Sequence, residues 1–119
     1  MSDVKIIEIT VGGAFEEEAS RRFVEAWHRA EHGESFSERH LAFESWEVLS
    51  RVLTGKRMEL LRYVHRHKVP SIRSLAKALG RDYKNVYADV QALAVVGLLV
   101  VSKGDVRADY DAIETKIAI

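Results

Sequence analysis

The chain has 119 residues, of which 47% are hydrophobic and 30% charged, as in a globular domain that buries its own core. It contains no cysteine, which excludes disulfides, a thiolate nucleophile and cysteine-based zinc sites. No apolar run is long enough for a membrane span or a secretory leader, so we expect a cytoplasmic location and no membrane partner.

The net charge is zero, but the charges are unevenly distributed along the chain. Residues 54–103 contain ten Lys and Arg against three Asp and Glu, a net charge of +7. Residues 1–53 carry a net charge of −5 and residues 104–119 a net charge of −2. A basic middle between acidic ends indicates a polyanionic partner for the middle, with a plain solvated surface as the alternative.

The N-terminal part predicts a strand followed by a helix. Residues 4–11 are rich in β-branched side chains and end at a pair of glycines, as strands do. Residues 14–31 have the apolar spacing of a helix and three glutamates in its first turn. Residues 34–53 allow two interpretations, a short extended segment followed by a helix capped by Ser45, or one continuous helix.

The basic segment predicts three helices, each with its own capping residues. Their expected N-caps and ends are Thr54 and His67, Ser71 and Gly80, and Asp82 and Val96. "LLVVSK" and "VRADY" then predict two strands joined by a two-residue "GD" turn, and "IETKIAI" predicts a last strand. The terminal strands, residues 4–11 and 113–119, could pair within one chain or between two.

This order of elements predicts an α+β, mostly helical fold. Residues 51–119 have the helix, helix, tight turn, helix and hairpin of a winged helix-turn-helix. Residues 1–50 would form an N-terminal strand–helix extension for dimerisation or partner binding. An apolar stripe on its helix, at Phe15, Phe23 and Trp27, favours a homodimer, because a single helix-turn-helix reads too short a site to be specific.

The third helix has two chemically different faces. At 100° per residue, Val86, Val90 and Leu93 cluster and must face the core. The opposite face is centred on Arg81, Lys84, Ala88 and Gln91, with Asn85 and Tyr87 on its flanks. Position 89, where the older helix-turn-helix pattern has an apolar residue, is Asp.

Those outward side chains suit double-stranded DNA. We expect the major groove to be read by Arg81, Lys84, Asn85, Tyr87 and Gln91, since Arg and Lys bind guanine or phosphate and Asn and Gln pair with adenine. Phosphate contacts are expected from Arg73, Lys77, Lys103 and Arg107. An ordinary solvated helix face and a plain solvated hairpin are the alternatives.

Other functional patterns are weak. His28 and His32 lie four residues apart on a predicted helix, a spacing that can hold a metal, but no third ligand is evident. There is no glycine-rich phosphate loop, nucleophile elbow or paired-carboxylate motif. We therefore expect no catalytic residues, no metal, no cofactor and no enzymatic activity.

Three stretches carry a family resemblance over residues 51–119, namely "RVLTGKRMELLRYV", "SIRSLAKALGRDYKNVYADVQALAVVGLLV" and "DYDAIETKIAI". They resemble small archaeal and bacterial transcriptional regulators with a MarR-like winged helix, in which "LGRDYKNV" is the most specific part. Relatives often have proline where this chain has Gly55. The resemblance implies DNA binding as a homodimer, and some members are described as antitoxins.

The expected function is therefore that of a sequence-specific transcriptional regulator, a dimeric repressor that reads the major groove with helix 82–96. The alternative belongs to another class. In it, the chain is an antitoxin-type interaction module whose acidic N-terminal part neutralises a basic toxin protein.

Overall fold

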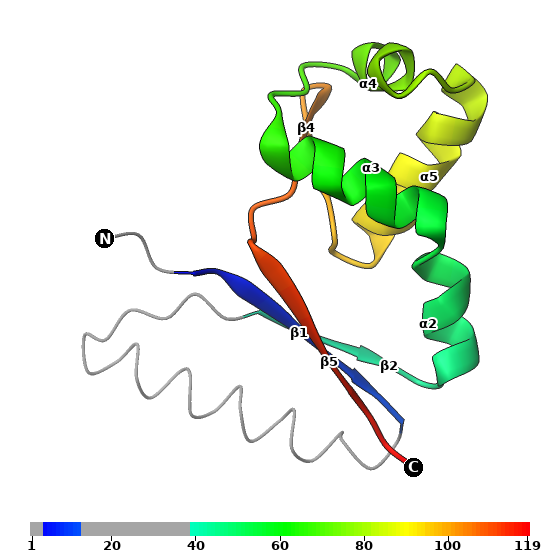
Figure 1. Ribbon diagram of the computed structural model, residues 1–119, viewed down its shortest axis with the longest axis vertical. Helices are drawn as coiled ribbons and strands as arrows, with labels where there is room; N and C mark the ends of the chain where they lie inside the picture. The colour runs from blue at the N-terminus through cyan, green and yellow to red at the C-terminus, as the bar shows by residue number, and fades with distance from the viewer. Residues whose placement is uncertain (1–3, 13–38) are drawn as a thin grey trace. The chain divides into compact units, whose positions relative to one another are not determined.

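The computed structural model describes residues 4–12 and 39–119 as an α+β protein (Figure 1). Its elements are β1 (Ile6–Val11), β2 (Arg39–Phe43), α2 (Trp46–Val52), α3 (Gly55–Arg66), α4 (Ile72–Leu79), α5 (Tyr83–Val95), β3 (Val100–Ser102), β4 (Asp105–Arg107) and β5 (Ala112–Ile117). They belong to two compact units. Unit 1 is Met1–Leu49 with Tyr110–Ile119, and unit 2 is Ser50–Asp109.

Unit 1 contains a parallel three-stranded sheet in the order β2-β1-β5. In the central strand β1, Ile7, Ile9 and Val11 are at most 2% exposed, so one side of this strand is fully apolar and buried. The strands expected at both ends of the chain are confirmed. They pair with each other within one chain, Ile6 opposite Ala112.

The partner of β5 is a strand from the opposite end of the chain. β5 was predicted as the last part of a domain over residues 51–119, but its backbone pairs with β1, and both strands belong to unit 1. Parallel strands need a long connection between them. Here that connection includes β2 and the whole of unit 2, and the sequence pattern of β5 does not reveal its partner.

The ambiguous segment before unit 2 is resolved in favour of the first interpretation over its described residues. β2 is a strand, and Ser45 follows it as the residue before α2. The Ser45 Oγ accepts a hydrogen bond from the Val48 backbone N–H at 3.3 Å, as an N-cap does.

In unit 2, α3 and α4 begin at the predicted caps. The Thr54 and Ser71 side chains accept hydrogen bonds from the backbone N–H groups of Arg57 and Ser74. Each cap satisfies one of the donors that a helix start leaves unpaired. Because both capping residues are adjacent in sequence to the helices they begin, local sequence was sufficient to place them.

The end of α4 is a tight turn at Gly80, which has a φ of 64°. The Gly80 N–H donates to the Lys77 carbonyl at 3.2 Å, and the Arg81 N–H donates to the Ala76 carbonyl at 3.0 Å. This pair of bonds is a Schellman motif, in which a left-handed residue, usually glycine, reverses the chain. The turn between α4 and α5 is therefore defined by backbone hydrogen bonds.

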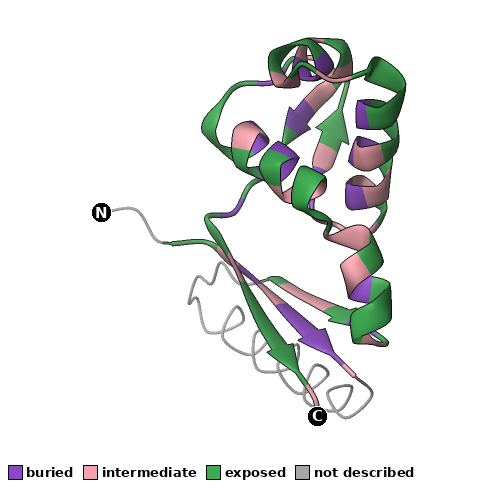
Figure 2. Cartoon of the chain, turned by 45° about the vertical axis from the view of Figure 1, so that its right-hand side comes forward, coloured by how far each residue is buried: buried purple, intermediate pink, exposed green. Residues whose placement is uncertain are grey.

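The helix that follows, α5, buries one face and exposes the other. Val86, Val90 and Leu93 are 0% exposed, as predicted from their spacing. In Figure 2 the buried positions of α5 lie along one side of the helix. Asp82 is the N-cap residue by position, but its side chain makes no capping hydrogen bond. The helix ends at Val95, and Gly97 follows it with a φ of 90°.

The hairpin of β3 and β4 is shifted by one residue from the prediction. Ser102 pairs with Asp105, so the two loop residues are Lys103 and Gly104, not "GD". Both have positive φ, 53° and 86°, as a type I′ turn requires. An isolated antiparallel bridge between Val69 and Val106 links the α3–α4 connection to β4.

Several predictions lie outside the described residues. These are the helix over residues 14–31, its apolar stripe at Phe15, Phe23 and Trp27, and the histidine pair His28 and His32. Within residues 4–12 and 39–119, no helix is both long and apolar enough to cross a membrane.

Candidate nucleic-acid interface

The outward face of α5 carries the predicted polar side chains. Lys84, Asn85, Tyr87, Ala88 and Gln91 are all exposed, whereas Val86, Val90 and Leu93 are buried. The predicted orientation of these five residues is confirmed. The face combines an ammonium group, two carboxamides and a phenol around one small residue, so it can offer several hydrogen bonds and admit close approach.

One flank of this face is an aromatic and cationic row that the sequence did not indicate. The Arg73 guanidinium carbon lies 4.9 Å from the centroid of the Tyr83 ring, and the Tyr83 and Tyr87 centroids are 6.0 Å apart. Both rings are exposed, 41% and 45%. Tyr83 was missed because its angular position on α5 is near the apolar side.

Arg81 differs from the other predicted groove residues. Its side chain is 18% exposed, and its Nη2 donates to the Asp89 Oδ2 at 2.8 Å. The Arg57 Nε donates to the other oxygen of the same carboxylate at 2.9 Å. Arg81 was expected to project from the helix. Instead it folds back onto α5 because the carboxylate two turns further along neutralises it.

The Asp89 carboxylate is the most electrostatically perturbed acid in the described part of unit 2. Burial alone raises its pKa, but the hydrogen bonds and positive charges of Arg57 and Arg81 outweigh burial, and the net pKa is lowered from 3.8. Asp89 is therefore ionised near neutral pH. The sequence pointed to this residue only as a departure from the apolar pattern.

The two cations predicted on α4 are both exposed. Arg73 and Lys77 lie four residues apart and so share one side of this short helix. Unlike Arg81, neither is held by a carboxylate among the ion pairs of the described residues. They are available to meet an anion.

The hairpin places Lys103 at its tip and Arg107 on its second strand. Lys103 is exposed to solvent. Its backbone lies in the left-handed region, which residues other than Gly and Asn rarely adopt. The Arg107 Nε lies 3.4 Å from the Asp105 Oδ2, yet the Arg107 side chain remains 53% exposed. Among the described residues, the charge of Arg107 is thus partly compensated by an ion pair and that of Lys103 is not.

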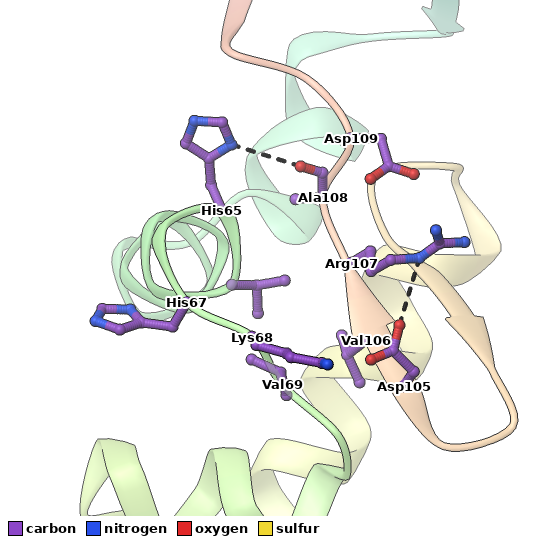
Figure 3. Close-up of a pocket in the computed structure, with 10 residues that line it drawn as sticks. His65, His67, Lys68, Val69, Asp105, Val106, Arg107, Ala108 and Asp109 are labelled. Carbon is purple, nitrogen blue, oxygen red and sulfur yellow. Dashed lines mark hydrogen bonds and ion pairs between the residues drawn. The ribbon is translucent and has the colours of Figure 1, made fainter.

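A hollow of about 270 Å³ lies between the end of α3 and β4 (Figure 3). Lys68 points toward the Asp105 side of it, and the His65 Nδ1 lies 3.5 Å from the Ala108 carbonyl oxygen. The His67 ring points away to the other side of α3, where it stacks on Tyr63. Charges of both signs line this hollow, so its chemistry favours no single class of ligand.

The charge of unit 2 sets the chemistry of its surface. Residues 50–109 contain twelve Lys and Arg against five Asp and Glu, a net charge of +7. No group of three metal-binding side chains occurs in the described part of the chain. The arrangement is suited to binding a polyanion through exposed cations and hydrogen-bond donors.

Comparison with known proteins identifies a family. The family model described as HVO_A0114 matches residues 52–115, more than half of the chain and all of α3, α4, α5 and the hairpin. No curated protein and no solved structure matches the chain. The chain therefore belongs to the HVO_A0114 family.

Proposed function

We propose that the protein is a sequence-specific DNA-binding transcriptional regulator, and that unit 2 is a winged helix-turn-helix of the MarR-like kind. The observation that carries the proposal is α5. One face of this helix is fully buried, and the other exposes Lys84, Asn85 and Gln91 around the small residue Ala88. Such a face suits the major groove, which admits a helix and displays hydrogen-bonding base edges.

The elements around α5 support the winged helix-turn-helix assignment. The α4–α5 pair is joined by the Gly80 turn, as in a helix-turn-helix. The β3–β4 hairpin follows α5 directly and corresponds to a wing. The isolated bridge between Val69 and Val106 ties this hairpin to the connection between α3 and α4.

Electrostatics supports DNA as the partner. Backbone phosphates supply most of the affinity in protein–DNA complexes, and they bind exposed Lys and Arg. Arg73, Lys77, Lys103 and Arg107 are exposed cations on α4 and on the hairpin. We assign phosphate contacts to these four, and base contacts to Lys84, Asn85 and Gln91, with Tyr87 at the edge of the groove.

A homodimer remains part of the proposal. A single recognition helix covers only a few base pairs, whereas two helices about 34 Å apart read successive major grooves. The most natural output of such a dimer on a promoter is repression, by exclusion of the polymerase.

The test begins with selection of bound sequences from a pool of random duplexes. The selected duplex is then compared with poly(dI-dC) by fluorescence anisotropy at two salt concentrations. We expect Asn85→Ala to lower the preference for the selected sequence by about 1–3 kcal/mol, as for a lost bidentate contact. Lys77→Gln should weaken binding to both duplexes and reduce the salt slope by about 0.9.

Lys5→Gln is the matched control, because it removes one exposed charge from unit 1. Selection that returns no enriched sequence would refute sequence-specific binding. Equal effects of Lys5→Gln and Lys77→Gln would show that binding depends on total charge and not on the assigned surface.

A further inference from the structure

The Asp89 carboxylate joins parts of unit 2 that are far apart in sequence. Arg57 is the third residue of α3 and lies 32 positions before Asp89, whereas Arg81 lies in the α4–α5 turn. The two N–H···O distances are 2.9 and 2.8 Å, and the three side chains are only 14–20% exposed. One carboxylate thus holds the middle of α5 to the start of α3 and to the turn before α5.

The same group of side chains reaches a fourth point. The Arg57 Nη1 donates to the carbonyl oxygens of Arg51 and Val52 at 3.1 Å each. These carbonyls belong to the last turn of α2, where helix carbonyls have no partner within the helix. Arg57 therefore donates hydrogen bonds both to the end of α2 and to Asp89, and these contacts restrict the conformations of its side chain.

Net stability does not explain why charged groups occupy these positions. Replacing buried ion pairs by apolar side chains is often neutral or stabilising, because ions lose their hydration on burial. The Arg81 Nη1 is buried and has no hydrogen-bond partner in the part of the chain that the structure describes, which adds a further cost. Directional bonds from two arginines, however, fix the rotation of α5 about its axis more strictly than an apolar contact does.

The rotation of α5 matters because Asp89 adjoins the outward face. Ala88 precedes Asp89 directly, and Asn85 lies one turn before it on the same side. A bidentate contact to a base needs distances near 2.9 Å and nearly linear geometry. A small rotation of the helix would move the carboxamide of Asn85 out of that range while leaving phosphate contacts in place.

We propose that Asp89 is a positioning residue for base recognition, and that Arg81 acts through Asp89 and not on a base. The inference rests on the proposed function. It assigns the specificity of the protein in part to a group that never touches DNA, and it removes Arg81 from the set of base-reading residues.

The experiment measures two quantities for each full-length variant, the affinity ratio between the selected duplex and poly(dI-dC) and the salt slope on both. Asp89→Asn keeps the size of the side chain but removes the charge that holds the two arginines. We expect it to lower the affinity ratio roughly 5- to 150-fold, the value of one bidentate contact, with an unchanged salt slope. Asp89→Glu retains the carboxylate and should recover part of the ratio.

Arg81→Gln is the second variant, and it leaves the Arg57–Asp89 pair in place in case Asp89→Asn does not fold. Its ratio should fall while its salt slope on both duplexes stays at the wild-type value. The double variant Arg81→Gln/Asp89→Asn should have the same affinity ratio as Asp89→Asn alone, as expected for residues that act as one unit.

Other outcomes overturn the inference. A salt slope reduced by about 0.9 in Arg81→Gln would show that Arg81 itself contacts phosphate. Wild-type affinity ratios in Asp89→Asn and Arg81→Gln would show that the ion pairs of Asp89 with the two arginines do not affect base recognition. Absence of salt-dependent binding by the wild-type protein would instead refute the proposed function, so the two failures are distinguishable.

Discussion

Lys103 at the tip of the hairpin leads to the sharpest prediction, because its backbone and its charge have opposite consequences. Its φ of 53° places a long side chain in the first loop position of a type I′ turn, where Asn is preferred. A left-handed conformation costs an ordinary L-residue about 1–2 kcal/mol, and less for Asn. Lys103→Asn should therefore relieve strain and remove one exposed cation.

The structure sets the size of both effects. Gly104 already supplies the second positive φ, so the substitution completes an Asn-Gly turn, and we expect a gain of about 1 kcal/mol and a Tm higher by about 4 °C. If Lys103 binds one phosphate, its loss lowers the salt slope by about 0.9 and the affinity at 0.15 M salt by about five-fold. The variant should be more stable and a weaker binder.

The assays are thermal unfolding by circular dichroism and anisotropy titrations against poly(dI-dC) at several salt concentrations. Lys103→Arg is the matched control, because it keeps the charge and the strain, and it should match the wild type in both assays. A lower Tm for Lys103→Asn would refute the strain argument. A wild-type salt slope for that variant would refute the phosphate contact.

Two further predictions concern stability. Gly80→Ala should lower the free energy of unfolding by about 1 kcal/mol, because the φ of 64° is unfavourable for Ala although a Cβ there meets no atom within 4 Å. The loss should appear as a lower urea midpoint with an unchanged m-value, and a wild-type midpoint would contradict the prediction. Burial raises the pKa of Tyr110 to about 12, so its phenol ionises more readily in the unfolded chain, and stability should fall between about pH 10 and 12. Tyr110→Phe should lack that fall in urea titrations, and an unchanged alkaline profile would contradict it.

Local features of the fold were predictable from sequence. Three residues act on backbone groups close to them in sequence. Thr54 and Ser71 place the starts of α3 and α4, and Gly80 places the end of α4. The buried face of α5 followed from a 100° periodicity for the same reason. These are short-range constraints, and sequence expresses them directly.

One turn with an unusual residue, and the features that depend on distant partners, were not predictable. The turn was placed one residue late because Lys103 contradicts the residue preferences of type I′ turns. Arg81 was expected to face outward because periodicity contains no information on its pairing with Asp89, and Arg57 lies 32 residues from that carboxylate. The sequence did not determine the strand with which β5 pairs, because an alternating strand pattern does not specify a partner.

The topology of the parallel sheet also has a consequence for how the protein is made. β1 pairs with β5 across more than a hundred residues, and closing a loop of that length costs about 4 kcal/mol of chain entropy. The helices of unit 2 are joined by short connections, so this unit can fold while the ribosome is still at work. β1 is synthesised first but acquires its β5 neighbour last, and until residues 112–117 emerge that edge of the strand is open to other chains.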